Sequence, residues 1–379
     1  MGDRGPGGRR LTVAHLTTVD MSLALLLATE LRVDVEAGYR VLALSAPGPY
    51  VPQVEALGVE YRPVRSFNRT WDARADAAAA LELYRLLRAE RPDVLHTHTP
   101  KAGVIGRVVG RLARVPVVVD TCHGLWLRDG DRPAKRAAVV AVEAAASAFA
   151  HFELYQNDGD RRTMRRFVGP RRARVVGNGV DLERFRFDPA GREAVRAELG
   201  VGPDELLVGG VGRRVAEKGV QELAAAARAL AGRARFVWIG PEEGEALEPE
   251  GLTFVGARAD MPAVYSALDV FALPSYREGF SRSGMEAAAC GRAMVLSDIR
   301  GCREVGEHER HLLLVPPADA GALTAALGRL LADAGLRARL GAAAAERARE
   351  AFDQRAVARA SIDTYRLVAH RRRLGWEAA

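Results

Sequence analysis

The sequence predicts an α/β protein built from two doubly wound domains, and three observations support this fold class. Short apolar runs rich in β-branched residues alternate with amphipathic helical stretches along the whole chain. The runs are apolar on both sides, which is typical of parallel strands covered by helices on both faces. The length of 379 residues also exceeds what one hydrophobic core usually holds. We therefore expect two Rossmann-like domains facing a cleft, with ligands at the carboxyl ends of both sheets.

The first domain is expected over residues 1–180. A helix that ends near Gly38 follows the first strand, and a later helix stops before Pro92 because proline disfavours helix in the residue before it. The last helix of the domain is long and rich in alanine. The predicted strands cover residues 11–16, 40–45, 93–98, 116–121 and 152–156, and the other predicted helices cover 73–90, 103–112 and 132–150.

The second domain is expected over residues 181–355. Residues 177–203 are rich in glycine, proline and charge, and they are interpreted as the connection between the domains. No strand follows the predicted helices at 336–351 and 353–373, so residues 356–379 are expected to cross back to the first domain. The predicted strands cover residues 206–212, 235–240, 252–256, 269–274, 293–297 and 311–316.

Cysteine usage and hydropathy indicate a cytoplasmic protein. Cys122, Cys290 and Cys302 lack CxxC spacing and do not suggest a disulfide framework. The segment 9–28 resembles a signal peptide, but His15 and Asp20 interrupt it and no cleavage site follows. No apolar run reaches spanning length, so membrane association is expected only as peripheral binding on the inner face.

The excess positive charge lies in the first half of the chain. Residues 1–180 carry 27 Lys and Arg against 19 Asp and Glu, whereas residues 181–379 carry 28 against 29. The densest stretch, residues 161–174, has seven arginines and no acid. It is either a solvated surface or a site for an anionic partner, such as a bilayer or a diphosphate-bearing acceptor. Nucleic acid is not expected, because no aromatic residues interleave the arginines and no recognition motif accompanies them.

Two glutamates mark the expected functional site. Glu278 lies in a Glu-Gly-Phe loop, and Glu286 follows in an Ala-rich helix. The backbone N–H groups at a helix start bind phosphate, and carboxylates accept hydrogen bonds from sugar hydroxyls. The motif therefore predicts a site for a sugar diphosphate. A glycosidase-like pair of acid and nucleophile is the rejected alternative, because the two glutamates are expected to contact different parts of one ligand.

A second motif supplies cations. The run GGVGRRVAEKG places Gly212 and Arg213 at a strand end and Lys218 at a helix start. Two cations there can neutralise a diphosphate leaving group. A nicotinamide-binding fingerprint would need a glycine where Val215 stands, so an oxidoreductase is not expected.

Histidines follow or end two strands of the first domain. His96 and His98 would point to the same face of a strand, so a metal site with His123 or Asp120 is one alternative. A hydrogen-bonded core histidine is the other alternative for His96, and a polar role in the cleft is favoured for His123. No metal is expected, since no further ligand pattern accompanies these residues.

Three segments together resemble the retaining glycosyltransferases of group 1 (family four): GVGRRVAEKG, PSYREGFSRSGMEAAACGRAMVLSDIRGCREV and GNGVDLERF. The first half, including HTHTPKAGVIGRVVGRLARVPVVVDTCHG, resembles the bacterial branch that builds capsule, O-antigen and other lipid-linked glycans. The resemblance covers nearly the whole chain and implies the two-domain GT-B architecture.

The resemblance also implies roles for individual residues. Glu278 would contact the donor sugar beside its anomeric carbon, and Glu286 would hold the ribose hydroxyls. Arg213 and Lys218 would bind the diphosphate, and His123 would contact the donor sugar. The leaving phosphate would deprotonate the acceptor hydroxyl, so the anomeric configuration is retained without a metal or other cofactor. The remaining expected donor-binding residues are Gly212, Arg258, Gly279, Phe280 and Ser281, and the expected acceptor-side residues are Thr18, Asp20, His98 and Lys101.

Three positions depart from the family pattern. Residues 17–22, TTVDMS, stand where many members carry a Gly-Gly pair between the first strand and helix. Ser281 replaces a common glycine, and Gly284 replaces a common large aliphatic residue. The departure at residues 17–22 bears on the acceptor-side residues, and neither of the other two removes a charged group.

The expected function is transfer of a hexose or N-acetylhexosamine from a nucleotide-diphosphate sugar, with UDP favoured, to an acceptor hydroxyl. A polyprenyl-diphosphate-linked glycan is the favoured acceptor, and a small natural-product or thiol-type molecule is the alternative. The rival functions are a UDP-sugar epimerase and a catalytically silent nucleotide-sugar binder. The sequence does not predict an oligomeric state.

Overall fold

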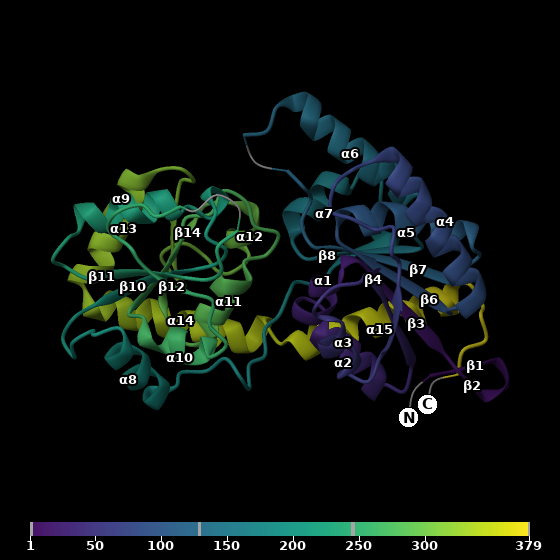
Figure 1. Ribbon diagram of the computed structural model, residues 1–379, viewed down its shortest axis with the longest axis horizontal. Coiled ribbons are helices and arrows are strands. Elements are labelled where there is room, and N and C mark those ends of the chain that lie inside the picture. The colour runs from purple at the N-terminus through teal and green to yellow at the C-terminus, as the bar shows by residue number, and fades with distance from the viewer. Residues whose placement is uncertain (1–2, 128–129, 244–246, 378–379) are drawn as a thin grey trace. The chain divides into compact units, whose positions relative to one another are not determined.

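The computed structural model describes residues 3–127, 130–243 and 247–377 and divides into two compact units. Unit 1 comprises Met1–Gly177 and Gln354–Ala379, and unit 2 comprises Asn178–Asp353. Each unit has a parallel sheet with helices packed on both faces (Figure 1), which confirms the predicted α/β class. The C-terminal helix belongs to unit 1.

Unit 1 is built on a seven-stranded sheet in the order β5-β4-β3-β6-β7-β8-β9, and every pairing in it is parallel. Successive strands are added toward one edge of the sheet from β3 to β5 and toward the other edge from β6 to β9. The boundary between β3 and β6 is therefore a topological switch point. A two-stranded antiparallel ribbon, β1 (Arg4–Gly5) with β2 (Arg9–Arg10), precedes the sheet. The strands are β3 (Thr12–Val19), β4 (Arg40–Ala46), β5 (Glu60–Pro63), β6 (Val94–His98), β7 (Val117–Cys122), β8 (Phe152–Tyr155) and β9 (Ala173–Val175).

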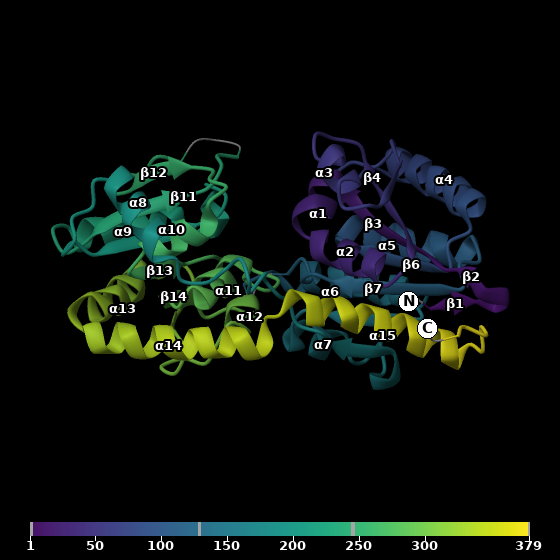
Figure 2. The ribbon, with the colours of Figure 1, turned by 90° about the horizontal axis from the view of Figure 1, so that it is seen from below.

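Alternation along the strands divides the core of unit 1 between the two faces of the sheet. Ala14, Leu16 and Leu95 pack against α4 and α5, whereas Val13 and Val94 pack on the opposite face. That opposite face is covered by α2 and α15, and Figure 2 shows α15, in yellow, lying along the sheet. The helices are α1 (Asp20–Leu25), α2 (Ala28–Glu36), α3 (Val51–Glu55), α4 (Ala73–Glu90), α5 (Pro100–Leu112), α6 (Pro133–Ser147), α7 (Asp158–Met164) and α15 (Gln354–Arg371).

Unit 2 is built on a six-stranded parallel sheet in the order β12-β11-β10-β13-β14-β15. Its switch point lies between β10 and β13. The strands are β10 (Leu207–Val211), β11 (Arg235–Ile239), β12 (Thr253–Gly256), β13 (Val270–Leu273), β14 (Ala293–Ser297) and β15 (Leu313–Val315). The helices are α8 (Pro189–Glu198), α9 (Val220–Ala229), α10 (Met261–Ala267), α11 (Arg282–Ala289), α12 (Arg300–Arg303), α13 (Ala320–Ala332) and α14 (Ala334–Ala351).

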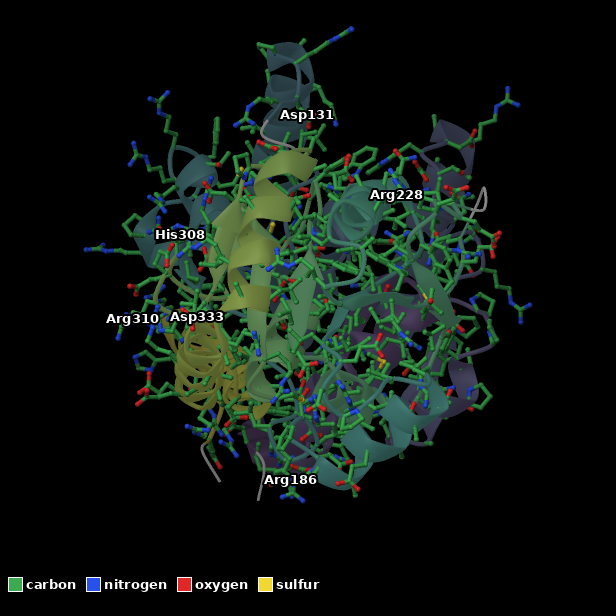
Figure 3. The ribbon with its side chains drawn as sticks, turned by 90° about the vertical axis from the view of Figure 1, so that its left-hand side faces the viewer. Asp131, Arg186, Arg228, His308, Arg310 and Asp333 are labelled. Carbon is green, nitrogen blue, oxygen red and sulfur yellow. The ribbon has the colours of Figure 1, made fainter. Side chains whose placement is uncertain are left out.

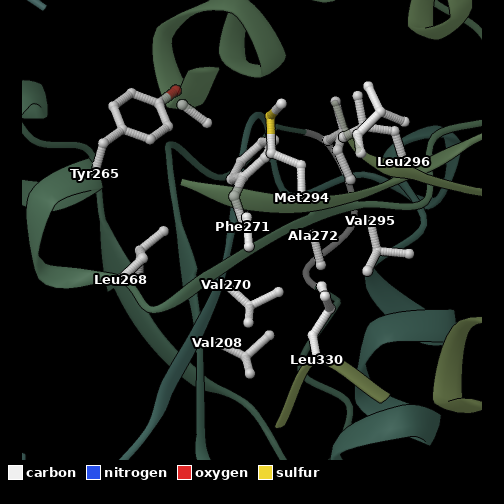
Figure 4. Close-up of a cluster of buried hydrophobic side chains, with 14 of the residues drawn as sticks. Val208, Tyr265, Leu268, Val270, Phe271, Ala272, Met294, Val295, Leu296 and Leu330 are labelled. Carbon is white, nitrogen blue, oxygen red and sulfur yellow. The ribbon is translucent and has the colours of Figure 1, made fainter. Parts of the chain in front are cut away.

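The core of unit 2 shows the same alternation (Figure 4). Val270 and Phe271 are consecutive residues of β13 that point to opposite faces of the sheet. Val270 lies on the side of Leu330 from α13, and Phe271 lies on the side of Tyr265 from α10. Charged side chains form the periphery of the unit, and Arg186, Arg228 and His308 are among the exposed ones (Figure 3).

The structure differs from the sequence-based expectation at several places. Residues 177–203 are not a simple connection, because they contain the helix α8. Asp188 caps the N-terminus of α8 with its side chain, and a proline is the first residue of the helix. The short edge strands β5 and β9 were not expected. Within the stretch 161–174, Arg172 and Arg174 donate to backbone carbonyls of Ser147 and Ala360, so not every arginine there belongs to a solvated surface.

In the described ranges, no helix is long and apolar enough to cross a membrane. All three cysteines are free thiols, and Cys290 and Cys302 are buried in unit 2.

Candidate functional site

The two glutamates of the predicted donor motif lie at the carboxyl edge of the unit 2 sheet. Glu278 follows β13, and Lys218 follows the neighbouring strand β10 at the switch point. Lys218 Nζ donates to Glu278 Oε1 at 2.7 Å, and both side chains are less than one-fifth exposed. The structure therefore brings together two residues that are separated by 60 positions in the chain.

Two glycines allow the Glu278 loop to approach its neighbours. A Cβ on Gly301, in α12, would lie only 2.5 Å from the backbone oxygen of Glu278. Ser281 N donates to Gly301 O at 3.0 Å, which ties the far end of the loop to the same residue. Gly219 has a φ of +77°, and a Cβ there would lie 2.2 Å from Pro274 O. Close backbone contacts thus position the loop before any ligand binds.

Helix α11 begins directly after this loop. The Ser281 hydroxyl accepts a hydrogen bond from Gly284 N at 3.2 Å and caps the helix. Glu286, one turn further on, accepts hydrogen bonds from the Tyr265 hydroxyl at 2.8 Å and from Arg282 Nε at 3.2 Å. Burial raises the pKa of Glu286, and the charge of Arg282 opposes that shift. The Glu286 carboxylate is thus held in place by two donors, one from α10 and one from the first residue of α11.

The other expected donor-side residues lie at the same carboxyl edge or beside it. Arg213 pairs with Glu243 at 2.8 Å, and both side chains are about half exposed. Arg258 pairs with Glu198 and Asp260 on the surface. Gly212 has a φ of +156° and accepts a hydrogen bond from Trp238 Nε1. Phe280 is buried in an edge-to-face contact with Phe352, and Gly279 precedes it in the loop.

Unit 1 has a cavity at its own switch point. The cavity has a volume of about 250 Å³ and lies where β3 and β6 end. Two of the expected acceptor-side residues, Thr18 and Lys101, line it. The other lining residues are Val19, Ser22, Arg69, Trp71, Thr99, Pro100 and Trp126. Two half-exposed tryptophans and basic groups therefore surround one small cavity.

The contacts of the expected acceptor-side residues differ. The Lys101 ammonium donates to Asn68 Oδ1 at 2.9 Å, pairs with Asp76 and lies 5.7 Å from the centre of the Trp71 ring. The Thr18 hydroxyl lies 3.0 Å from the Thr99 hydroxyl. Asp20 does not line the cavity. It is buried, and its two oxygens accept hydrogen bonds from Met21 N and Tyr50 N.

His123 follows β7 and is partly exposed. Its Nδ1 accepts a hydrogen bond from Gln156 Nε2 at 2.9 Å, and its Nε2 lies 3.0 Å from His98 Nδ1. Burial lowers the pKa of His123 to about 4, so its imidazole is neutral near pH 7. His98, an expected acceptor-side residue, is fully buried, and its Nδ1 faces His123 and not the surface. His96, also fully buried, has both ring nitrogens in hydrogen bonds, to the Tyr365 and Thr121 hydroxyls.

Sequence reasoning missed several residues of these sites. The cavity tryptophans, Trp71 and Trp126, lie in loops without a motif, and the one signal in the sequence is that the chain has only four tryptophans. Tyr265 contacts Glu286 from α10, which no local pattern connects to α11. His15 of β3 was missed too: its Nδ1 lies 3.1 Å from His98 Nε2, and only the order of the strands in the sheet brings these two residues together.

The sequence matches two family profiles. Residues 205–333 match the profile described as "Glycosyl transferases group 1", and residues 24–179 match "Glycosyl transferase 4-like domain". The chain is 30% identical over 279 residues to an Escherichia coli UDP-Gal:alpha-D-GlcNAc-diphosphoundecaprenol alpha-1,3-galactosyltransferase, covering 68% of this chain and 71% of that protein. It is also 30% identical over 372 residues to a D-inositol 3-phosphate glycosyltransferase of Streptomyces bingchenggensis, covering 88% and 81% respectively.

Solved structures share the fold. The crystal structure of Anabaena Alr3699/HepE in complex with UDP-glucose aligns with a TM-score of 0.80 at 20% identity, over 94% of this chain and 100% of that chain. Sucrose-phosphate synthase from Thermosynechococcus elongatus aligns with a TM-score of 0.79 at 22% identity, over 96% and 100%. The two-domain GT-B architecture is therefore that of this chain.

Proposed function

The chain belongs to the glycosyl transferases of group 1, and from that membership we propose that it is a retaining enzyme that uses a nucleotide-diphosphate sugar as donor. The transferred group would be a hexose or an N-acetylhexosamine, and we favour UDP as the nucleotide. One observation carries the proposal. The Lys218–Glu278 pair lies at the switch point of unit 2, directly before the capped start of α11, where α/β sheets bind ligands.

The proposed donor contacts follow from the chemistry of each group. Lys218 and Arg213 neutralise the diphosphate, whose negative charge grows as the glycosidic bond breaks. Glu278, released by Lys218 when the diphosphate binds, accepts a hydrogen bond from the sugar. Glu286, oriented by the Tyr265 hydroxyl, accepts hydrogen bonds from the ribose. Room for the ligand is left by the backbone of Gly279 and Ser281 and by the turn at Gly212. We assign Phe280 to the support of the loop and Arg258 to the support of the sheet edge.

The proposed chemistry needs no protein nucleophile. The leaving phosphate takes the proton of the acceptor hydroxyl on the same face of the sugar, so the anomeric configuration is retained. His123 serves this sugar-transfer step as a neutral hydrogen-bonding group, because burial lowers its pKa to about 4. No group on the chain is assigned to a metal, and added chelator should leave turnover unchanged.

Substitution of the two glutamates tests the donor assignment. Glu278→Gln keeps the shape of the side chain and should abolish turnover, whereas Glu286→Gln should mainly raise the donor KM. Glu193→Gln, on the exposed surface of α8, is the matched control and should leave both constants unchanged. Wild-type kinetics in both site variants would reject the assignment.

For the acceptor we propose a phosphate-bearing molecule bound at the unit 1 cavity. Arg69 and Lys101 supply positive charge, and Trp71 and Trp126 supply surfaces on which a sugar ring or an isoprenoid can pack. Thr18 is assigned to the acceptor hydroxyl. A polyprenyl-diphosphate glycan of cell-surface polysaccharide synthesis is favoured, since similar proteins include a galactosyltransferase named for a diphosphoundecaprenol substrate. A small phosphorylated acceptor is the alternative, since others are named for inositol 3-phosphate.

Vesicle binding separates the two acceptor classes. Arg165, Arg166 and Phe167 are exposed together in unit 1, a combination that binds anionic bilayers. With a lipid-linked acceptor, the protein should sediment with anionic vesicles at low salt and dissociate as salt rises. Absence of vesicle binding at every salt concentration favours the small acceptor and a protein free in the cytoplasm.

Incubation with donor alone tests the rival functions. A UDP-sugar epimerase would change the sugar ring without any acceptor. A silent nucleotide-sugar binder would bind donor but release no nucleotide with any acceptor. The proposed transferase releases nucleoside diphosphate only when an acceptor is present, beyond slow hydrolysis.

A further inference from the structure

A line of hydrogen-bonded side chains crosses the interior of unit 1. It begins at Asp34 of α2, whose Oδ2 lies 2.8 Å from His15 Nε2. His15 Nδ1 lies 3.1 Å from His98 Nε2, and His98 Nδ1 lies 3.0 Å from His123 Nε2. The line ends at Gln156, 2.9 Å from His123 Nδ1. Asp34, His15 and His98 are fully buried, whereas His123 is partly exposed, so the line connects the interior to the surface.

The strand geometry explains why these rings meet. His15 of β3 pairs with His96 of β6 in register, and His98 lies two residues further along β6 on the same face. That face is the one covered by α2 and α15, which is why Asp34 can reach His15. Because β3 and β6 flank the switch point, the line leads to the carboxyl edge of the sheet, where His123 lies.

The line has a direction. The Gln156 amide N–H donates to His123 Nδ1, so the single proton of neutral His123 is on Nε2 and is donated to His98. His98 Nδ1 accepts this hydrogen bond, so the proton of His98 is on Nε2 and is donated to His15 Nδ1. His15 Nδ1 accepts in turn, so the proton of His15 is on Nε2 and is donated to the Asp34 carboxylate. Every ring therefore donates toward Asp34 and accepts from the side of Gln156.

We propose that Asp34, His15, His98 and His123 form a proton relay that keeps His123 uncharged while it switches which ring nitrogen carries the proton. A proton from solvent forms a new N–H bond at His123 Nδ1. His123 then passes its Nε2 proton to His98 Nδ1, and His98 passes its own Nε2 proton to His15 Nδ1. His15 ends as an imidazolium beside the Asp34 carboxylate, and Gln156 turns its amide oxygen to accept from His123.

The charges around the line favour this end state. Burial lowers the pKa of His98 and of His123, so neither holds the added proton. Asp34 and Glu30, both on α2, raise the pKa of His15 against the effect of its burial. Burial raises the pKa values of Asp34 and Glu30, and the charge of His15 opposes both shifts, so an imidazolium at His15 favours the carboxylates beside it. Three other titratable groups of the described residues lie near this end: His96 on β6 and Tyr365 on α15, which hydrogen bond to each other, and Tyr39, which interacts electrostatically with Asp34.

His15, His98 and Asp34 are thus positioning residues for His123, and this part of the inference rests on the proposed role of His123 in sugar transfer. The relay gives that role a pH dependence. Near neutral pH the His123 ring stays neutral. When His15 gains its proton, the proton of His123 is on Nδ1 instead of Nε2, so the donor and acceptor nitrogens of His123 exchange.

Histidine ¹⁵N NMR of the full-length protein tests the relay directly. We expect the His98 and His123 ring signals to change from the Nε2–H to the Nδ1–H tautomer at one midpoint, shared with the protonation of His15. His308, exposed on the surface of unit 2, is an internal reference (Figure 3). Independent midpoints for the three rings, or protonation of His123 before His15, would overturn the proposal.

Two variants separate the relay from general damage to the core. Asp34→Asn removes the charge and should lower the shared midpoint by about one pH unit or more. If the tautomer of His123 controls transfer, kcat/KM changes with pH at the same midpoint and should shift equally. Thr121→Val removes a hydrogen bond to His96, which lies beside the line but not in it, and should move neither. An unchanged midpoint in Asp34→Asn would reject the relay. If Asp34→Asn does not fold, the wild-type titration still decides.

Two further outcomes keep the explanations distinct. Atoms of His15, Glu30, His96 and His98 lie within 4.8 Å of one another, so metal analysis of the isolated protein is included. Stoichiometric metal would overturn the relay, because ligation would occupy nitrogens that pass the proton. If the tautomers switch together while His123→Gln keeps full turnover, the relay stands and the role of His123 in transfer fails.

Discussion

Substitution of Gly301 by alanine should move the Glu278 loop without touching its functional groups. The added Cβ would lie 2.5 Å from Glu278 O, and an ordinary contact begins near 3.4 Å, so the loop must shift by about 0.9 Å. The flexible end of a side chain could yield, but here the obstacle is backbone, and Ser281 N is bonded to Gly301 O. A shift of this size should cost roughly 100-fold in kcat, and the overpacking should cost about 1–3 kcal/mol of stability.

The assay is release of nucleoside diphosphate at saturating donor, together with a melting curve. Gly321→Ala is the matched control, because Gly321 is exposed at the start of α13. A Cβ added there would lie 3.4 Å from its nearest neighbouring atom, which is an ordinary contact. The control should keep wild-type turnover and melt at the same or a slightly higher temperature. A folded Gly301→Ala protein with kcat within two-fold of wild type would refute the reasoning that this contact positions the catalytic loop.

Three other predictions concern single contacts. Tyr265→Phe removes a hydrogen bond to Glu286 and should raise the donor KM by roughly 10-fold with kcat nearly unchanged; an unchanged KM would remove Tyr265 from the site. Trp126→Ala should raise the acceptor KM but not the donor KM, and the opposite pattern would contradict the cavity assignment. His123 has a pKa of about 4 when folded and about 6.5 when unfolded, so the unfolded chain binds more protons between these values. Stability should therefore fall as pH drops from 6.5 to 4, by at most about 3 kcal/mol, and His123→Gln should flatten that loss in urea titrations.

The fold was predictable where burial makes a strong local pattern. Strands such as β13 and β14, VFAL and AMVLS, are almost entirely apolar, and such runs indicate parallel strands covered on both faces. The edge strands β5 and β9, EYRP and ARV, were missed because they are short and carry charge or proline. Helix α8 was missed because its sequence, PAGREAVRAE, has a proline and a glycine among its first three residues and four charged residues but only one large apolar residue, so that it looks like a loop when read locally.

Most of the proposed donor-side residues were suggested by the sequence because they lie in two short motifs. Their partners were not, since pairs such as Lys218 with Glu278 depend on which strands are neighbours. The same limit applies to unit 1. His15 and His98 are 83 residues apart, and only the pairing of β3 with β6 brings their rings together. The unit 1 cavity likewise depends on Trp71 and Trp126, which lie in loops that carry no motif.

The most direct test of the proposed chemistry is the anomeric configuration of the product, followed by ¹H NMR during turnover. A UDP-α-sugar should give an α-linked product, with nucleoside diphosphate released in equal amount and only when an acceptor is present. Glu278→Gln should give neither product nor nucleotide. A β-linked product would contradict the retaining mechanism, and full activity of Glu278→Gln would contradict the donor site proposed here.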